Sequence, residues 1–410
     1  MNKVKLSLIL IALQASGTSL YANTNSLSQQ INELQDQINQ IKTSKQPNLN
    51  IKLNPTAFKT ILSGSAAYPE KTTSVVKMIS DNTIQTGETA IGGKLEGTGN
   101  YKNNTPSNFS SSSYTLDTKS NLSFQGQIGI VSKPSDLFSL VMNFSTKDLN
   151  DMTTKQMYGV LGNLSYSPLY MIAGYKYIDF GYMARYSNKI PNFNRAFNSS
   201  NAAQVEVGLI KNNINVMITA FNGDPNTYTN TNQVSNTAAN ISYSMKATNN
   251  LSGSIGAGVI KGINNQYNLI NGQPITLSVK RAPAWDIFKT LQYNFENKSK
   301  LTAYIEYIQA SRNGFNSTKP SSLSTSVAYS FITNGWKLIP SFSYSYLLGA
   351  GLNYSNTATP SITETNSINQ YVLSLATYLG PIKVGVDYGR LIVSKNYNDQ
   401  IGILKAEYLF

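Results

Sequence analysis

Lysine, arginine and the carboxylates are the side chains of this chain that could do chemistry, because its 410 residues include no cysteine and no histidine. Their absence excludes thiolate and imidazole catalysis, disulfides and the usual thiolate or imidazole metal sites. Paired acids such as Glu96 and Glu306 are the remaining candidates for acid–base catalysis. Acids are also expected wherever strands line a wet interior, so we expect no enzymatic activity, no cofactor and no bound metal ion.

The composition points to a sheet with one wet face and one apolar face. Charged residues make up 13% of the chain, against about 25% in a typical soluble protein. Neutral polar residues and 26 tyrosines fill the deficit, and the abundance of aromatics argues against disorder. The formal net charge is +13, and it falls to +11 if Lys3 and Lys5 are removed with an N-terminal leader.

From about residue 89 onward, apolar and polar residues alternate with period two. Sixteen segments of roughly ten residues show this pattern, and a β-strand needs about 9–11 residues to cross a membrane. The segments lie near 89–101, 122–130, 138–144, 158–166, 171–177, 205–209, 214–220, 239–245, 251–259, 284–295, 300–310, 323–332, 335–346, 369–379, 381–391 and 401–410.

The connections between these segments alternate between short and long. Short ones lie near 133–135, 167–168, 212–213, 248–250, 297–299, 334–335 and 380–381, and they contain turn-forming residues. Long ones lie near 102–119, 146–155, 179–202, 223–236, 262–283, 311–322, 347–368 and 392–400. Tight periplasmic turns and larger outer loops are typical of transmembrane barrels, whereas a soluble sandwich has no reason to sort its loops. We therefore predict an all-β fold, an antiparallel outer-membrane β-barrel of about 16 strands over residues 89–410, with both chain ends on the periplasmic side.

Aromatic residues support the barrel interpretation. The chain ends in alternating apolar residues with Tyr408 and a terminal Phe410, which resembles the assembly signal of outer-membrane barrel proteins. This implies the barrel-assembly machinery as a partner, together with outer-membrane lipid and lipopolysaccharide. Other aromatics gather at the segment ends, where their amphipathic rings suit the two membrane interfaces.

The N-terminus predicts export. Residues 1–22 have the pattern of a secretory signal peptide, with Lys3 and Lys5 before an apolar run and Ala22 at a plausible cleavage point. The predicted location is therefore the outer membrane of a Gram-negative bacterium. Export and the scattered distribution of basic residues both argue against nucleic acid as a partner.

Residues 23–46 carry an apolar heptad stripe. The stripe consists of Leu27, Ile31, Leu34, Ile38 and Ile41. It predicts a short coiled coil between copies of the chain, with a homotrimer favoured over a dimer. An amphipathic helix lying against its own domain is the alternative. Residues 47–88 follow as a periplasmic linker or a plug segment, and their apolar stretches leave open whether they lie under, inside or beside the barrel.

Strand parity assigns charged residues to the lumen or to the outer mouth of the barrel. The lumen candidates are Lys94, Glu96, Lys176, Glu206, Lys246, Glu306, Lys337, Lys383 and Asp387, and the mouth candidates include Arg185, Lys189, Arg195, Arg281 and Arg312. A cationic mouth would concentrate anions such as polycarboxylates or phosphate-bearing solutes, although attraction to lipopolysaccharide explains it equally well. Lys289 is an exception because its parity places it on the lipid face, and a bulge near Phe288 or a snorkelling side chain would resolve this.

A leader, a short Gln-rich coiled coil over Leu27–Ile41, a linker and an Asn/Ser/Tyr-rich barrel ending in Phe410 resemble the organisation of the siderophore porins typified by the legiobactin receptor. The resemblance covers nearly the whole chain, but it rests on organisation and composition, so no ligand residues carry over. It implies uptake of an iron-siderophore complex through a barrel that lacks the plug domain of energised receptors. Trimeric porins with a periplasmic coiled coil, which take up dicarboxylates, have a similar layout.

Three functions remain open from the sequence. The first is a porin-like channel for a ferric siderophore. The second is a less selective porin for small anionic or neutral solutes, as the balanced charges of the lumen suggest. The third is a structural or adhesive surface barrel, suggested by the long Asn/Ser/Thr-rich loops at 102–119, 179–202 and 347–368.

Overall fold

The structure is a computed structural model that describes residues 50–63, 67–106, 120–147, 151–184, 186–198, 201–222, 234–263, 266–268, 274–277, 279, 282–314, 317–354, 361–393 and 397–410. The predicted signal peptide (1–22) and the heptad stripe of Leu27, Ile31, Leu34, Ile38 and Ile41 lie outside the described residues, as do Arg185 and Arg281.

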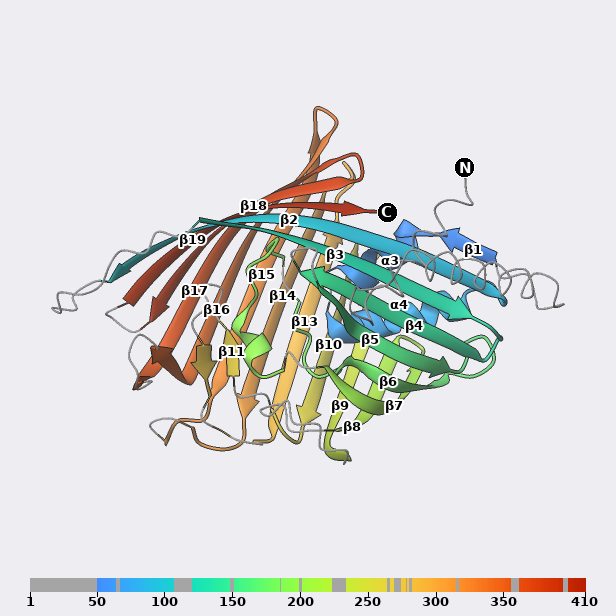
Figure 1. Cartoon of the computed structure of the whole chain (residues 1–410), viewed down its shortest axis with the longest axis horizontal. Coiled ribbons are helices and arrows are strands. Elements are labelled where there is room, and N and C mark those ends of the chain that lie inside the picture. Colours follow the sequence, from blue (N-terminus) through green and yellow to red (C-terminus); the bar gives the residue numbers. More distant parts are fainter. Residues whose placement is uncertain are drawn as a thin grey trace, which may run out of the picture. The chain divides into compact units, whose positions relative to one another are not determined.

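Sixteen long strands among the described residues form one closed antiparallel barrel (Figure 1). They are β2 (Glu88–Pro106), β3 (Ser120–Lys133), β4 (Phe138–Lys147), β5 (Asp151–Leu161), β6 (Leu169–Tyr177), β7 (Asn201–Lys211), β8 (Ile214–Asn222), β9 (Val234–Lys246), β10 (Leu251–Ile260), β13 (Ala284–Asn294), β14 (Lys300–Ala310), β15 (Ser321–Thr333), β16 (Trp336–Tyr354), β17 (Ser361–Leu379), β18 (Ile382–Val393) and β19 (Tyr397–Leu409). The last strand, β19, pairs with the first, β2, which closes the ladder. The predicted all-β, sixteen-stranded antiparallel barrel is confirmed.

Most loops sort by length as the sequence predicted, but three differ: only three residues separate β4 from β5 and β18 from β19, where long loops were expected, and seven separate β5 from β6, where a short turn was expected. Two-residue turns join β7 to β8 and β15 to β16, and their residues Asn212, Asn213, Asn334 and Gly335 all have positive φ. Asparagine and glycine tolerate this backbone region better than other residues, which is why they make tight hairpins. We call the end of the barrel with these turns the short-turn end and the opposite end the long-loop end.

Alternation along each strand separates a polar interior from an apolar exterior. In β7, Gln204 and Glu206 are buried in the lumen wall, while Val205 and Val207 are exposed on the outside. Exposed large apolar side chains recur in the same way on the other strands. Hydrocarbon offers no hydrogen-bond partners, so a closed ladder with an apolar exterior is the arrangement that suits lipid.

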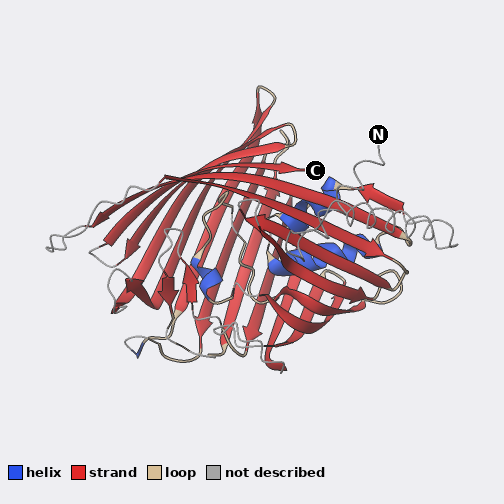
Figure 2. Ribbon diagram, viewed as in Figure 1, coloured by secondary structure: helices blue, strands red, loops and turns tan. Residues whose placement is uncertain are grey.

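Two helices, α3 (Pro55–Leu62) and α4 (Tyr68–Ser80), precede the barrel in sequence and lie within it (Figure 2). α4 has Pro69 and Glu70 in its first turn and Lys77 in its last turn, which suits both helix initiation and the helix dipole. None of the described helices is long and apolar enough to span a bilayer.

Glycines let α3 approach the inner wall of the barrel. A Cβ atom on Gly92 of β2 or Gly129 of β3 would come within 2.6 Å of the ring of Phe58. A larger residue at either position would push α3 away from the wall. The lack of a Cβ atom at these two glycines therefore creates the space that the helix fills.

The remaining described elements are short. They are β1 (Asn50–Leu53), which pairs with β2, β11 (Gln266–Asn268), β12 (Pro274–Thr276) and the single-turn helix η1 (Phe193–Ala196). β11 and β12 pair with each other in the connection between β10 and β13, and β12 also pairs with β16.

The connection from β6 to β7 folds into the lumen instead of projecting outward. We call its residues 178–184 and 186–198 the inward loop. Phe180, Met183, Phe193 and Phe197 of this loop are almost completely buried, in one cluster with wall residues of the barrel. The expectation of an outer loop at 179–202 was therefore wrong, because these apolar side chains find their burial inside the barrel.

Lys289 faces outward near the middle of β13, as its parity predicted. It lies opposite Ile255 of β10 and Ile305 of β14, whose side chains are also exposed. The register is regular on both sides of the strand, so the bulge proposed near Phe288 is absent. The ammonium group must snorkel from the lipid face or meet another molecule there.

We predict that Lys289→Leu stabilises the barrel by about 2 kcal/mol, since a lysine near the bilayer midplane costs roughly 2–4 kcal/mol. Denaturant unfolding in lipid vesicles measures the change. Lys289→Arg keeps the charge and should leave stability unchanged. A loss of stability in the leucine variant would mean that the ammonium group has a specific partner.

Candidate functional site in the barrel lumen

The helix pair, α3 and α4, occupies the lumen beside strands β2 to β6. Its buried residues Phe58, Ile61, Leu62, Val75, Val76, Met78 and Ile79 form one apolar cluster with Ile84 and the wall residues Ala90, Val131, Val141, Tyr158, Val160, Tyr170 and Ile172. Of the segment between the predicted coiled coil and the barrel, α3 and α4 thus pack against the inner wall of the barrel. This packing places the helix pair in the path through the lumen.

Polar contacts fix the C-terminal end of α4 at the short-turn end of the barrel. The buried ammonium group of Lys133 in β3 donates to the Ile79 carbonyl (2.9 Å) and to Asn82 Oδ1 (3.0 Å). The Ser80 hydroxyl accepts a hydrogen bond from the Leu164 amide (2.8 Å) in the turn between β5 and β6. A cation at a helix C-terminus satisfies free carbonyls and opposes the dipole.

Two buried carboxylates hold the inward loop across the lumen. Glu306 of β14 accepts backbone hydrogen bonds from Tyr182 (2.5 Å) and Met183 (2.9 Å). Asp387 of β18 accepts from the backbone amides of Asn188 (3.0 Å) and Lys189 (2.7 Å). Buried carboxylates need such donors, because their desolvation is costly. These two predicted lumen acids therefore anchor a loop.

The inward loop and α4 also contact each other. Thr72 of α4 donates to Asp179 of the loop (2.7 Å). The ring of Tyr68, at the start of α4, stacks on Tyr177 with 4.7 Å between centroids, and the Arg195 guanidinium lies 5.6 Å from the Tyr68 ring centre. The loop that enters from the long-loop end is thus joined to the helix that is fixed at the short-turn end.

A buried ion cluster lies beneath this contact. Lys176 of β6 donates to Asp179 (2.6 Å) and to Glu206 of β7 (2.8 Å), and all three side chains are at most 2% exposed. Asp179 therefore serves both Lys176 and Thr72. Burial raises the pKa of Tyr186, farther along the loop, to about 12.

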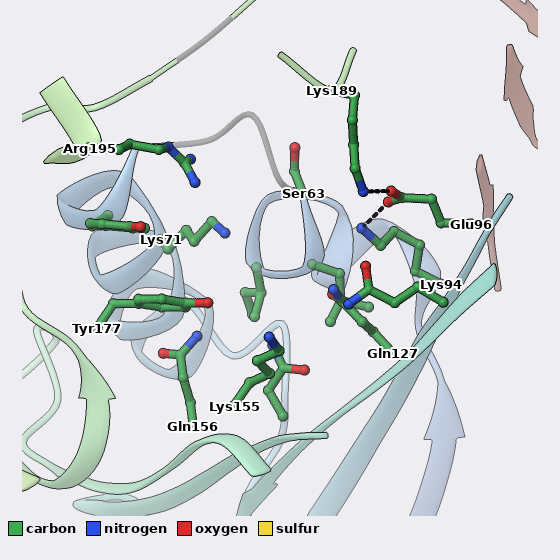
Figure 3. Close-up of a pocket in the computed structure, with 15 residues that line it drawn as sticks. Ser63, Lys71, Lys94, Glu96, Gln127, Lys155, Gln156, Tyr177, Lys189 and Arg195 are labelled. Carbon is green, nitrogen blue, oxygen red and sulfur yellow. Dashed lines mark hydrogen bonds and ion pairs between the residues drawn. The ribbon is translucent and has the colours of Figure 1, made fainter. Parts of the chain in front are cut away.

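A cavity of about 190 Å³ opens between the helix pair, the inward loop and the wall (Figure 3). Its charged lining consists of Lys71 of α4, Lys94 and Glu96 of β2, Lys155 of β5, and Lys189 and Arg195 of the inward loop. Amides of Gln125, Gln127, Asn143 and Gln156 complete the polar side. Five cations against one carboxylate make the cavity strongly cationic.

Glu96 is shared by several lysines at one side of the cavity. Its carboxylate pairs with Lys94 (3.0 Å), with Lys189 of the loop (2.5 Å) and with Lys405 of β19 (3.2 Å). Glu407 pairs with Lys405 (2.8 Å) behind them. Three lysines thus share two carboxylates, so this side of the cavity keeps a positive excess.

A β-bulge brings Lys155 into the cavity. Asn143 pairs with Gln156 and Phe144 with Thr154, so Lys155 has no partner in the ladder between β4 and β5. A bulge re-aims neighbouring side chains, and here both Lys155 and Gln156 line the cavity. Residue 155 was expected to end a loop, and no local sequence signal distinguishes a bulge from a loop end at this position.

The structure brings together only some of the predicted lumen residues. Lys94, Glu96 and Arg195 line the cavity, Lys176 and Glu206 lie in the ion cluster, and Glu306 and Asp387 anchor the inward loop. The other predicted residues lie elsewhere. Lys337 lies over the Tyr378 ring, and Lys383 of β18 lies opposite Glu407 of β19 in the strand register. Lys246 and Arg312 are exposed. Lys71 and Lys155 were missed, because they lay in segments assigned to a linker and a loop.

Two predicted mouth residues lie inside the barrel. Lys189 and Arg195 were placed at the outer rim because their segment was interpreted as an outer loop. The inward course of the loop carries both side chains to the cavity instead.

Among the described residues, no group of three or more acidic side chains is arranged to hold a metal ion.

Comparison with known proteins identifies the fold. No protein-family model and no curated protein matches the chain. Among solved structures, OprB of Pseudomonas putida is 11% identical with a TM-score of 0.55, over 78% of this chain and 94% of that one. The outer membrane channel DcaP of Acinetobacter baumannii is 14% identical (TM-score 0.50, 78% and 97% covered). An anion-selective porin from Comamonas acidovorans is 10% identical (TM-score 0.50, 78% and 99% covered). The chain therefore has the fold of outer-membrane porins.

We predict that Lys176→Met destabilises the protein by about 3–5 kcal/mol, because it leaves Asp179 and Glu206 buried without their cation. Denaturant unfolding of the refolded barrel measures the loss. Lys155→Met, on a partly exposed residue, is the matched control and should cost much less. Equal effects of the two substitutions would contradict the role of the ion cluster.

Proposed function

We propose that the protein is a porin-type channel in the outer membrane of a Gram-negative bacterium and that it takes up a small anionic solute. The observation that carries this proposal is the contact between α4 and the inward loop beside a cavity lined by five cations and one carboxylate. The apolar exterior of the barrel and its porin fold support the membrane location. Field lines from the cationic lining favour anions over cations.

We further propose that the helix pair gates the channel. A lumen for free diffusion would be open, whereas here α3 and α4 fill part of it. Besides its apolar packing, α4 contacts the wall through hydrogen bonds, among them one from Asn215 of β8 to the Thr73 hydroxyl (2.8 Å). A segment held in this way can leave the wall without breaking the ladder of the barrel.

A disulfide between α4 and the wall tests the gate. The chain has no cysteine, so Thr73→Cys with Asn215→Cys introduces a single pair, at side chains already in contact. We expect oxidation to lower the conductance in planar bilayers and a reducing agent to restore it, because the locked helix cannot leave the lumen. The two single-cysteine variants are the controls. Equal conductance in both redox states of a fully cross-linked sample would contradict gating by the helix pair.

A ferric siderophore is the second candidate solute, and the occupied lumen favours it over general diffusion. An occupied lumen fits gated, ligand-specific uptake. Such a complex is bulky, and we expect its passage to displace the helix pair, which fills part of the lumen. A less selective porin for small anionic or neutral solutes fits the cavity as it stands.

Growth of a deletion strain separates these two solutes. If the protein carries a ferric siderophore, the strain should fail to grow when that complex is its only iron source, and the intact gene should restore growth. Normal growth of the deletion strain would exclude the siderophore while leaving the small-anion channel in place.

The other sequence-based proposals concern assembly. We retain the coiled coil over Leu27–Ile41 as the basis of a homotrimer, and lipid, lipopolysaccharide and the barrel-assembly machinery as partners. An adhesive surface role is less well supported, because one of the three long loops that suggested it folds into the lumen.

A further inference from the structure

The cavity between the helix pair and the inward loop has the features of a ligand site. Lys94 is only 2% exposed, and a buried ammonium group needs compensating negative charge. Glu96 is the one carboxylate of the lining, and it already serves three lysines. Lys71 and Lys155 face the same cavity without adding an acid to the lining. A ligand with at least two negative charges would balance this excess.

The neutral side of the cavity adds a second requirement. Asn143 is 5% exposed, and its Oδ1 atom has no hydrogen-bond partner. Gln125, Gln127 and Gln156 lie in the same lining. A buried amide oxygen without a partner costs free energy, and an alcohol group on the ligand could donate to it. The lining therefore fits an anion that also carries a hydroxyl group.

The size of the cavity bears on the size of the ligand. A volume of about 190 Å³ suits a small organic acid, which could contact the helix pair, the inward loop and the wall at once.

We propose that this cavity binds a small hydroxy-polycarboxylate, a class for which citrate is a representative. Lys94 and Lys155 of the wall, Lys71 of α4 and Lys189 of the inward loop would contact the carboxylates, and Asn143 the hydroxyl. The inference deepens the proposed channel function and rests on it, because it names the class of solute that the cavity binds. The bound anion would connect the helix pair, the inward loop and the wall.

Calorimetric titration of the full-length protein in detergent tests the site with citrate, tricarballylate (citrate without its hydroxyl), inorganic phosphate and glycerol. We expect saturable citrate binding, weaker tricarballylate binding and no glycerol binding. Lys71→Gln and Lys155→Gln should each weaken citrate binding about tenfold, as expected for one charge-assisted contact. Lys246→Gln, an exposed lysine outside the cavity, is the matched control and should bind citrate like the unchanged protein. Heat-modifiable gel mobility checks that each variant forms the barrel.

The outcomes separate this inference from the proposed function. Citrate binding that is absent, or equally strong in the Lys71 and Lys155 variants, overturns the inference. Tighter binding of phosphate than of citrate overturns the polycarboxylate class, and equal binding of citrate and tricarballylate overturns the role of the hydroxyl. Bilayer conductance is measured on the same preparation. Conductance without citrate binding leaves the channel proposal intact, whereas citrate binding without conductance or uptake contradicts the channel and leaves the site.

Discussion

Backbone amides and carbonyls that face hydrocarbon must be paired within the protein, and this constraint organises the whole molecule. The ladder meets it by joining β19 to β2, where Tyr397–Leu409 runs antiparallel to Lys94–Pro106. Closure leaves one face of each strand toward lipid and the other toward the lumen. Apart from Lys289, the charged strand residues named above lie on the second face, so the candidate site is on the inside of the barrel.

Inside the barrel, carboxylates position chain segments that would otherwise be loose. Glu306 and Asp387 accept backbone amides of the inward loop, and Asp179 joins that loop to Lys176 and to α4. A buried carboxylate without hydrogen-bond donors would be costly. The amides that Glu306 and Asp387 hold in place also supply the donors that these carboxylates need. The lumen acids are thus largely committed to structure, and the lysines and Arg195 around the cavity set its charge.

Two segments from opposite ends of the lumen meet at the cavity. The inward loop comes from the long-loop end, and α4 is fixed by Lys133 at the short-turn end. Their contacts, Thr72 with Asp179 and Tyr68 with Arg195, mean that displacement of one segment disturbs the other. A ligand that contacts both segments would therefore act on the proposed gate as well as on the charge of the lumen.

The barrel itself could be predicted from the sequence, because period-two alternation, turn residues and strand length are local properties of the chain. The parity of Lys94, Glu96, Lys176 and Glu206 followed from the same pattern. The course of residues 178–198, the bulge at Lys155 and the place of α3 and α4 could not. The loop depends on hydrogen bonds to distant residues. Glu306 accepts from the amide of Met183, 123 residues away, and Asp387 accepts from the amide of Asn188, 199 residues away. Local pattern thus determined which face each strand residue occupies, and only the closed barrel decided which of those residues meet around one cavity.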